Sequence, residues 1–290
     1  MTESSDDLLD ALVIRCAFPR PGALVDVAFS GGPDSTALIA LATHAGLRVT
    51  AWHVDHRLRP ESAADAERAA AIAEQLGARF QLQVADLDDG PNLEARARSA
   101  RRSLLPDDAM TGHTADDQAE TLLLALLRGS GATGLAAMRP GPTHPILGLR
   151  RHETLAVCEK LGLSPLTDPS NVDPRFRRNR LRHEVVPLLD DVAERDVAPL
   201  LARAADLVRD DDDLLESLAA GIVPTDVAAL RDAPLPLARR ALRRWLTIDG
   251  YPPDAAAIER VLAVVRHEAA ACEVGGGRRV SRSEGRLRVE

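Results

Sequence analysis

Apolar runs alternate with segments of helical length along the N-terminal part of the chain. Short, partly β-branched apolar runs predict buried strands at residues 24–29, 48–54, 79–84 and 108–112. The segments around them have the length and composition of helices, at residues 8–18, 35–45, 61–76, 92–105 and 114–128. This alternation predicts the α/β class, with a doubly wound parallel sheet that helices cover on both faces.

The pattern changes after residue 184. Helical periodicity continues at residues 192–218, 235–245 and 255–267, with no β-rich run between them, and the final segment alternates around Ser283-Glu284-Gly285 as a hairpin would. We therefore expect two domains. Residues 1–184 hold the sheet, and residues 185–290 form a smaller, mainly helical domain that ends in a short β-hairpin; a helix beginning near residue 179 joins them.

The turn between the first strand and its helix is rich in small residues: Ser30, Gly31, Gly32, Pro33, Asp34 and Ser35. A strand–turn–helix unit directs backbone N–H groups and the positive end of a helix dipole at one point, which suits an anion. Glycine lets the backbone approach that anion closely. A P-loop is excluded because it needs a lysine next to the turn, and the only lysine is Lys160. The turn could also be purely structural, with its glycines present only to let the backbone turn from strand to helix.

Ligands of parallel sheets bind beyond the carboxyl ends of the strands, so the residues that follow each strand are candidates. His53 and Asp55 share one face of the second strand. Asp116 and Glu120 lie four residues apart on one helix face, where they repel unless a cation lies between them. Oxygen ligands suit Mg²⁺ that also contacts phosphates, so Asp34 and Asp116 are the candidate Mg²⁺ ligands.

Two other interpretations of these groups stay open. Asp117 follows Thr114 by three residues, which also fits a purely structural helix cap. His53, Asp55 and His56 could instead bind a transition metal.

Charge and cysteine content narrow the class of protein. The net charge of −8 argues against binding nucleic acid with the whole surface, but arginines gather at residues 96–102 and 175–182, and such runs are either RNA contacts or solvated helix faces. The three cysteines, at positions 16, 158 and 272, form no CxxC pair, as expected in a reducing compartment. No signal peptide and no run of membrane-spanning length is present, so we expect a cytoplasmic protein with no membrane partner.

The glycine turn resembles the loop of the PP-loop (N-type) ATP pyrophosphatase superfamily. Four further stretches, in order, resemble motifs of the tRNA(Ile)-lysidine synthase family: residues 53–62, 112–121, 144–153 and 167–189. The chain departs from the family pattern in two places. His144 stands where the family often has arginine, and Arg102 stands where an aromatic residue is usual. The resemblance is to a short form without the last C-terminal domain.

The resemblance implies a reaction. ATP adenylates the wobble cytidine of the CAU-anticodon isoleucine tRNA and releases pyrophosphate; L-lysine then attacks the cytidine and AMP leaves. It assigns residues 30–35 with His53 and Asp55 to ATP binding. It assigns catalysis to Asp34, Asp116, Asp117 and Arg98, and substrate binding to Glu120, Arg101, Arg178, Asn179 and Arg180. Mg²⁺ is the expected metal, and a homodimer is compatible with the sequence.

Two other functions are kept as alternatives. A PP-loop tRNA thiolation enzyme would need cysteine or iron–sulfur chemistry, and the dispersed cysteines disfavour it. A non-catalytic nucleotide-binding module would keep the loop without turnover, and the acidic residues at positions 34, 116 and 117 argue against it.

Overall fold

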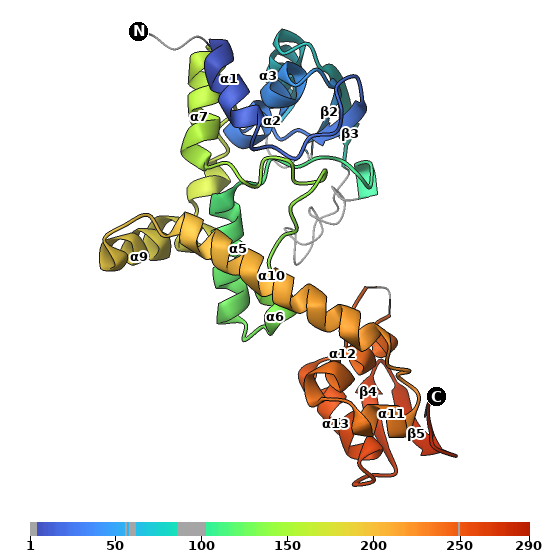
Figure 1. The fold of residues 1–290 in the computed structure, drawn as a ribbon. Coiled ribbons are helices and arrows are strands. Elements are labelled where there is room, and N and C mark those ends of the chain that lie inside the picture. Colours follow the sequence, from blue (N-terminus) through green and yellow to red (C-terminus); the bar gives the residue numbers. More distant parts are fainter. Residues whose placement is uncertain (1–4, 56, 58–61, 86–102, 249) are drawn as a thin grey trace. The chain divides into compact units, whose positions relative to one another are not determined.

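The computed structural model describes residues 5–55, 57, 62–85, 103–248 and 250–290 (Figure 1). The chain divides into two compact units, Met1–Asp206 and Leu207–Glu290. The boundary lies inside the long helix α10 (Ala198–Ala220). No helix in the described ranges is both long and apolar enough to cross a membrane.

The first unit is built on a parallel sheet of β1 (Leu24–Ala28), β2 (Arg48–Asp55) and β3 (Arg79–Val84), in that spatial order. Helices α2 (Pro33–His44) and α3 (Ser62–Gln75) connect the strands and pack against them (Figure 1). The predicted α/β class and these three strands are confirmed. The parallel order places the ends of β1 and β2 side by side, with the glycine turn between β1 and α2.

The fourth predicted strand, residues 108–112, is wrong as a strand. Met110 alone pairs with β1: its N–H donates to the Asp26 carbonyl, and its own carbonyl accepts from Ala28, both at 2.8 Å. The N–H of Thr111 donates instead to the carbonyl of Thr143, at 2.9 Å. The contact of this segment with β1 is therefore an isolated bridge at Met110 and not a strand.

Helix α2 is the centre of the core in this unit. Six consecutive residues, 37–42, are at most 3% exposed. The helix packs against β1, β2, α1 (Ser5–Val13) and α7 (Arg151–Lys160), and a helix that is apolar on all sides must be buried in this way. The glycine turn is thus attached to a helix that is buried along most of its length.

The other helices of the unit follow the sheet. They are α5 (Ala115–Leu127), α6 (Ala132–Leu135), the 3-10 helix η1 (Pro169–Val172), α8 (Arg177–Arg180), the π-helical turn η2 (Leu181–Val185) and α9 (Val186–Ala193). The helix predicted at 114–128 is confirmed, and α1 ends earlier than predicted, at Val13. Most of the helix predicted at 92–105 lies outside the described residues.

The second unit has its own core. Helices α11 (Val227–Asp232), α12 (Leu235–Leu246) and α13 (Ala255–Val265) pack with an antiparallel sheet of β4 (Ala271–Gly275), β5 (Arg278–Ser283) and β6 (Arg286–Val289). The predicted hairpin is β5–β6. The segment predicted as a hairpin also contains β4, a third strand that the prediction did not separate; β4 ends at Gly275, and Gly276 and Gly277 form the turn into β5.

Gly112 lies against the glycine turn, and its replacement tests that packing. A Cβ at this position would lie 2.8 Å from the Asp34 carbonyl carbon and 2.9 Å from the Ser35 nitrogen, both backbone atoms that cannot move alone. We expect Gly112→Ala to lower the free energy of unfolding by about 1–3 kcal/mol, measured by urea titration. Gly131→Ala is the control, since no atom lies within 4 Å of its added Cβ. Equal stability of both variants would contradict this packing.

Candidate active site

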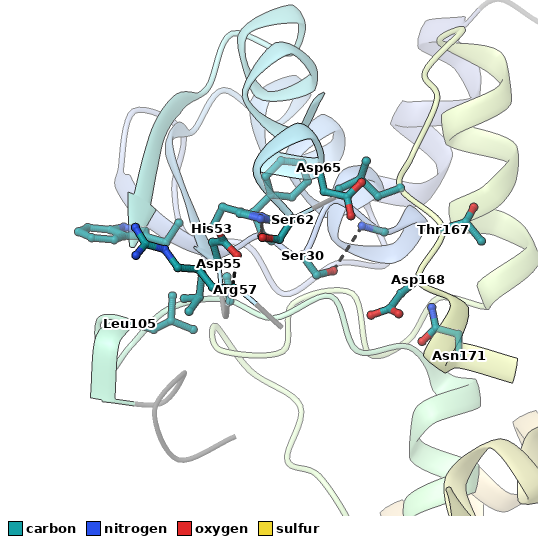
Figure 2. Close-up of a pocket in the computed structure, with 16 residues that line it drawn as sticks. Ser30, His53, Asp55, Arg57, Ser62, Asp65, Leu105, Thr167, Asp168 and Asn171 are labelled. Atoms are coloured by element: carbon teal, nitrogen blue, oxygen red, sulfur yellow. Dashed lines mark hydrogen bonds between the residues drawn. The ribbon is translucent and has the colours of Figure 1, made fainter. Parts of the chain in front are cut away.

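A cavity of about 440 Å³ lies at the carboxyl ends of β1 and β2. Ser30 and Gly32 of the glycine turn form one part of its wall, and Asp168 and Asn171 lie across from His53 and Asp55 (Figure 2). This is where open α/β sheets bind their ligands. The turn residues that line the cavity are therefore placed to meet a bound anion.

The glycine turn is held in a tight conformation by its own hydroxyls. The Ser35 hydroxyl donates to the Gly32 carbonyl at 3.0 Å, and the Gly32 N–H donates to Ser30 Oγ at 3.3 Å. Gly31 has a φ of 80°, and a Cβ there would come within 2.4 Å of Leu166. Gly32 caps α2 without a side chain, and Pro33 occupies the first helical position. The first-turn N–H groups of α2 consequently keep their capacity for a ligand.

His53 and Asp55 lie on one face of β2, as predicted from the alternation of side chains, and both line the cavity. The Nδ1 of His53 donates to the Phe29 carbonyl at 2.8 Å, since a carbonyl can only accept. Asp55 accepts from the backbone N–H of Arg57 at 2.8 Å. Each side chain is 8% exposed and fixed. His56 lies outside the described residues.

The other predicted acids do not line this cavity. Asp34, Asp116, Asp117 and Glu120 gather instead with four arginines in what we call the acid–arginine cluster. The arginines are Arg150 and Arg151 from α7 and its N-cap, Arg178 from α8 and Arg182 from η2. Four carboxylates thus face four guanidinium groups next to the first turn of α2.

Glu120 is the most buried member of the cluster, at 1% exposed. It accepts from Arg178 Nε and Arg182 Nε, each at 2.8 Å, and from Arg151 at 3.3 Å. A buried carboxylate is tolerated only when it is paired in this way, because its desolvation is costly. Glu120 therefore needs cations around it, whether they come from the chain or from a ligand.

Asp116 and Asp117 are held as charged groups. Burial would raise the pKa of Asp116, but two hydrogen bonds from Arg150 at 3.0 Å and one from the Arg151 backbone at 2.8 Å bring that pKa below its ordinary value. Burial likewise opposes ionisation of Asp117, and the Arg151 charge and the Thr114 backbone N–H lower its pKa overall. Asp117 also completes the capping box of α5, so its structural interpretation holds.

Asp34 differs from the other acids in its electrostatics. Burial raises its pKa above the ordinary value, although the hydroxyl of Thr154 and the charge of Arg151 act in the opposite direction. One carboxylate oxygen accepts from the Thr154 hydroxyl, and the other lies 3.6 Å from Arg151 Nε. Asp34 therefore has a raised pKa, whereas the pKa values of Asp116 and Asp117 are lowered.

The predicted Mg²⁺ ligands do not fit a shared ion in this arrangement. Both oxygens of Asp116 accept from Arg150, and Asp34 faces Thr154 and Arg151. No three His, Cys, Asp or Glu side chains within the described residues are grouped as metal ligands would be. The donors that surround these carboxylates are cations and hydroxyls of the chain itself.

The predicted substrate-binding arginines are placed differently from one another. Arg178 is committed to Glu120 and to Thr121 Oγ1, at 3.0 Å, and Asn179 is buried and donates to the Asp173 carbonyl. Arg180 points outward and pairs with exposed Glu184. Arg98 and Arg101 lie outside the described residues.

Sequence reasoning missed three residues at this site: Arg150, Arg151 and Thr154. It placed Arg182 only in the arginine run at residues 175–182, as an RNA contact or part of a solvated face. One signal was available. The motif that ends at residue 153 carries two adjacent arginines, and a set of buried acids requires nearby cations.

The family models and the similar proteins agree on one family. Residues 9–189 match the PP-loop domain and residues 226–288 match the TilS substrate binding domain. The tRNA(Ile)-lysidine synthase of Rhodococcus erythropolis is 44% identical over 80% of this chain and 76% of its own length. That of Mycolicibacterium paratuberculosis is 46% identical, over 77% and 74%. That of Nocardia farcinica is 44% identical, over 89% and 87%.

A solved structure supports the fold alone. A U34-tRNA thiolase from Methanococcus maripaludis superposes with a TM-score of 0.55 and 16% identity, over 71% of this chain and 78% of that one.

The lowered pKa of Asp116 predicts a specific dependence of stability on pH. A carboxylate whose folded pKa is depressed stabilises the fold above its unfolded pKa, and that contribution disappears as pH falls through the folded pKa. We expect Asp116→Asn to lower the free energy of unfolding at pH 7 by about 1.5–3 kcal/mol, and the difference from the wild type to shrink below about pH 4. Urea titrations at several pH values measure this.

Glu184→Gln provides the control for that pH series. The bond from Arg180 also lowers the pKa of Glu184, but this pair is exposed to water and so contributes little to stability. The unfolding profile of Glu184→Gln should stay close to that of the wild type. The electrostatic explanation would be refuted if the loss in free energy of unfolding caused by Asp116→Asn were constant from pH 7 to pH 3.

Proposed function

The chain belongs to the tRNA(Ile)-lysidine synthase family, and from this premise we propose how its residues share the formation of lysidine. The enzyme uses ATP and acts on tRNA, at the wobble cytidine of the CAU-anticodon isoleucine tRNA. The observation that supports our assignment best is the cavity at the lysine-free glycine turn, with a second, charged site on the other side of that turn.

ATP occupies the cavity in this proposal. The turn at residues 30–35 and the first N–H groups of α2 hold its pyrophosphate, while His53 and Asp55 fix the cavity wall. Backbone donors aimed at the leaving group stabilise charge as the bond between the α- and β-phosphates breaks. Mg²⁺ belongs to the proposal only as the ion that accompanies ATP, since Asp34 and Asp116 do not fit a shared ion and no step is assigned to it.

L-lysine binds to the acid–arginine cluster. Asp117 and Glu120 are carboxylates that a substrate ammonium group can pair with, provided that it replaces a guanidinium group of the chain. The attacking amine must lose a proton before it bonds to C2 of the adenylated cytidine. Asp34 is the best acceptor for that proton, because its pKa is raised whereas those of Asp116 and Asp117 are lowered.

In this proposal the RNA binds to the arginine-rich segment at residues 175–182, and the arginines of that segment differ in how freely they can reach it. Arg180 is exposed and can reach a phosphate without breaking a buried contact. Arg178 already donates to Glu120 and Thr121, so a phosphate contact by Arg178 competes with these internal bonds. Arg98 and Arg101 keep their predicted roles in catalysis and substrate binding. We expect the reaction to take place in the cytoplasm, where tRNA and ATP occur.

Thiolation is the weaker alternative for this chain. Burial raises the pKa of the Cys16 thiol to about 12 and that of Cys158 to about 11, and it also raises that of Cys272. A thiol must be ionised to act as a nucleophile or sulfur carrier. The three thiols are therefore poorly ionised, and they fit small apolar residues that are partly or fully buried. A non-catalytic module is disfavoured by the presence of Asp34, Asp116 and Asp117 in a buried, charged arrangement.

Lysine transfer is tested directly by incubating the protein with ATP, radiolabelled lysine and CAU-anticodon isoleucine tRNA. We expect label in the RNA, with one AMP and one pyrophosphate formed for each lysine incorporated. Labelled arginine and ornithine serve as competitor substrates. No label in the RNA, or equal incorporation of all three amino acids, would reject the proposed function.

The RNA-binding roles of Arg180 and Arg178 are separated by their variants. Arg180→Ala should weaken tRNA binding and reduce the slope of log K against log salt by about one, without loss of thermal stability. Arg178→Ala should also lower the melting temperature, because it leaves buried Glu120 with one partner fewer. Arg48→Ala is the control, since Arg48 begins β2 at the opposite end of the sheet. Unchanged salt dependence in Arg180→Ala would assign Arg180 to the solvated surface.

A further inference from the structure

The first turn of α7 contacts the first turn of α2 through one side chain that the assignments above do not use. Thr154 is 0% exposed, and its hydroxyl donates to Asp34 Oδ1. Its Oγ1 also lies 2.8 Å from the Arg151 carbonyl oxygen, within its own helix. A hydroxyl has one hydrogen, and a carboxylate is the stronger acceptor, so the bond to Asp34 takes it.

Asp34 is held on its other side by the same helix. Its Oδ2 lies 3.6 Å from Arg151 Nε, a buried atom with no hydrogen-bond partner among the described residues. Arg151 and Thr154 are three residues apart and share a face of α7. The carboxylate therefore has a hydroxyl before one oxygen and a guanidinium N–H before the other, and both come from one rigid element.

We propose that Thr154 is a positioning residue that fixes the orientation of the Asp34 carboxylate between the nucleotide cavity and the acid–arginine cluster. The inference rests on the proposed function, in which Asp34 accepts the proton of the attacking amine. Among the residues that the structure describes, the long contact to Arg151 is the polar contact of the Asp34 carboxylate that remains without the Thr154 hydroxyl. Even a small misplacement of the proton acceptor lowers the rate of the chemical step. ATP binding should be unaffected, because Thr154 does not line the cavity.

Thr154→Val tests this, because valine keeps the shape and removes only the hydroxyl. We expect kcat for lysine transfer to fall about 100-fold, while KM for ATP stays within about twofold. Thr154→Ser restores the hydroxyl and should recover most of kcat. Thr43→Val is the matched control: Thr43 bonds only to carbonyls of its own helix, α2, near the end remote from the turn, so kcat should not change.

A double-mutant cycle keeps the proposal falsifiable if Thr154→Val is poorly folded. In the Asp34→Ala background, Thr154→Val should cause no further loss of kcat, because the group that it positions is absent. Equal rates of Thr154→Val and the wild type, equal loss in Thr154→Val and Thr154→Ser, or additive losses in the cycle would each overturn the positioning role. A wild-type protein that transfers no lysine would instead reject the proposed function itself.

Discussion

The burial of charge beside the first turn of α2 is the constraint on which the site depends. Four carboxylates and four arginines meet there, and Glu120 is almost completely removed from water. Each charge is tolerated only because its partners are supplied by other elements. The contacts from α7, α8 and η2 therefore do two things. They join the helices that follow the sheet to α2, and they set the protonation of the acids that the proposed chemistry uses.

The glycine turn separates two environments that the reaction needs to keep apart. On the cavity side, hydroxyls and backbone N–H groups face the space assigned to ATP, without any lysine. On the other side, Asp34 enters the acid–arginine cluster. A single short segment thereby joins the site of pyrophosphate release to the site of amine attack. Close packing of Gly112 and Leu166 against this segment keeps it in place.

The internal ion pairs link the proposed lysine site to the proposed RNA-binding segment. Glu120 is paired with Arg178 and Arg182, whose segment is the one assigned to RNA. A substrate ammonium group that enters must replace a guanidinium group, so the buried acid keeps a counter-ion throughout. The cluster is in this respect a cation site whose cations are supplied by the chain.

The sequence by itself determined the α/β class, three of the strands and the glycine turn. It also placed His53 and Asp55 on one face of the cavity, since period-2 alternation and turn chemistry are local properties. It could not show that residues 108–112 pair through Met110 alone, or that Asp116, Asp117 and Glu120 lie across the turn from the cavity, in contact with Arg150, Arg151 and Arg182. Those contacts join segments that lie more than thirty residues apart. Only tertiary packing decides which buried charge meets which partner, because desolvation and pairing depend on all the surrounding elements together.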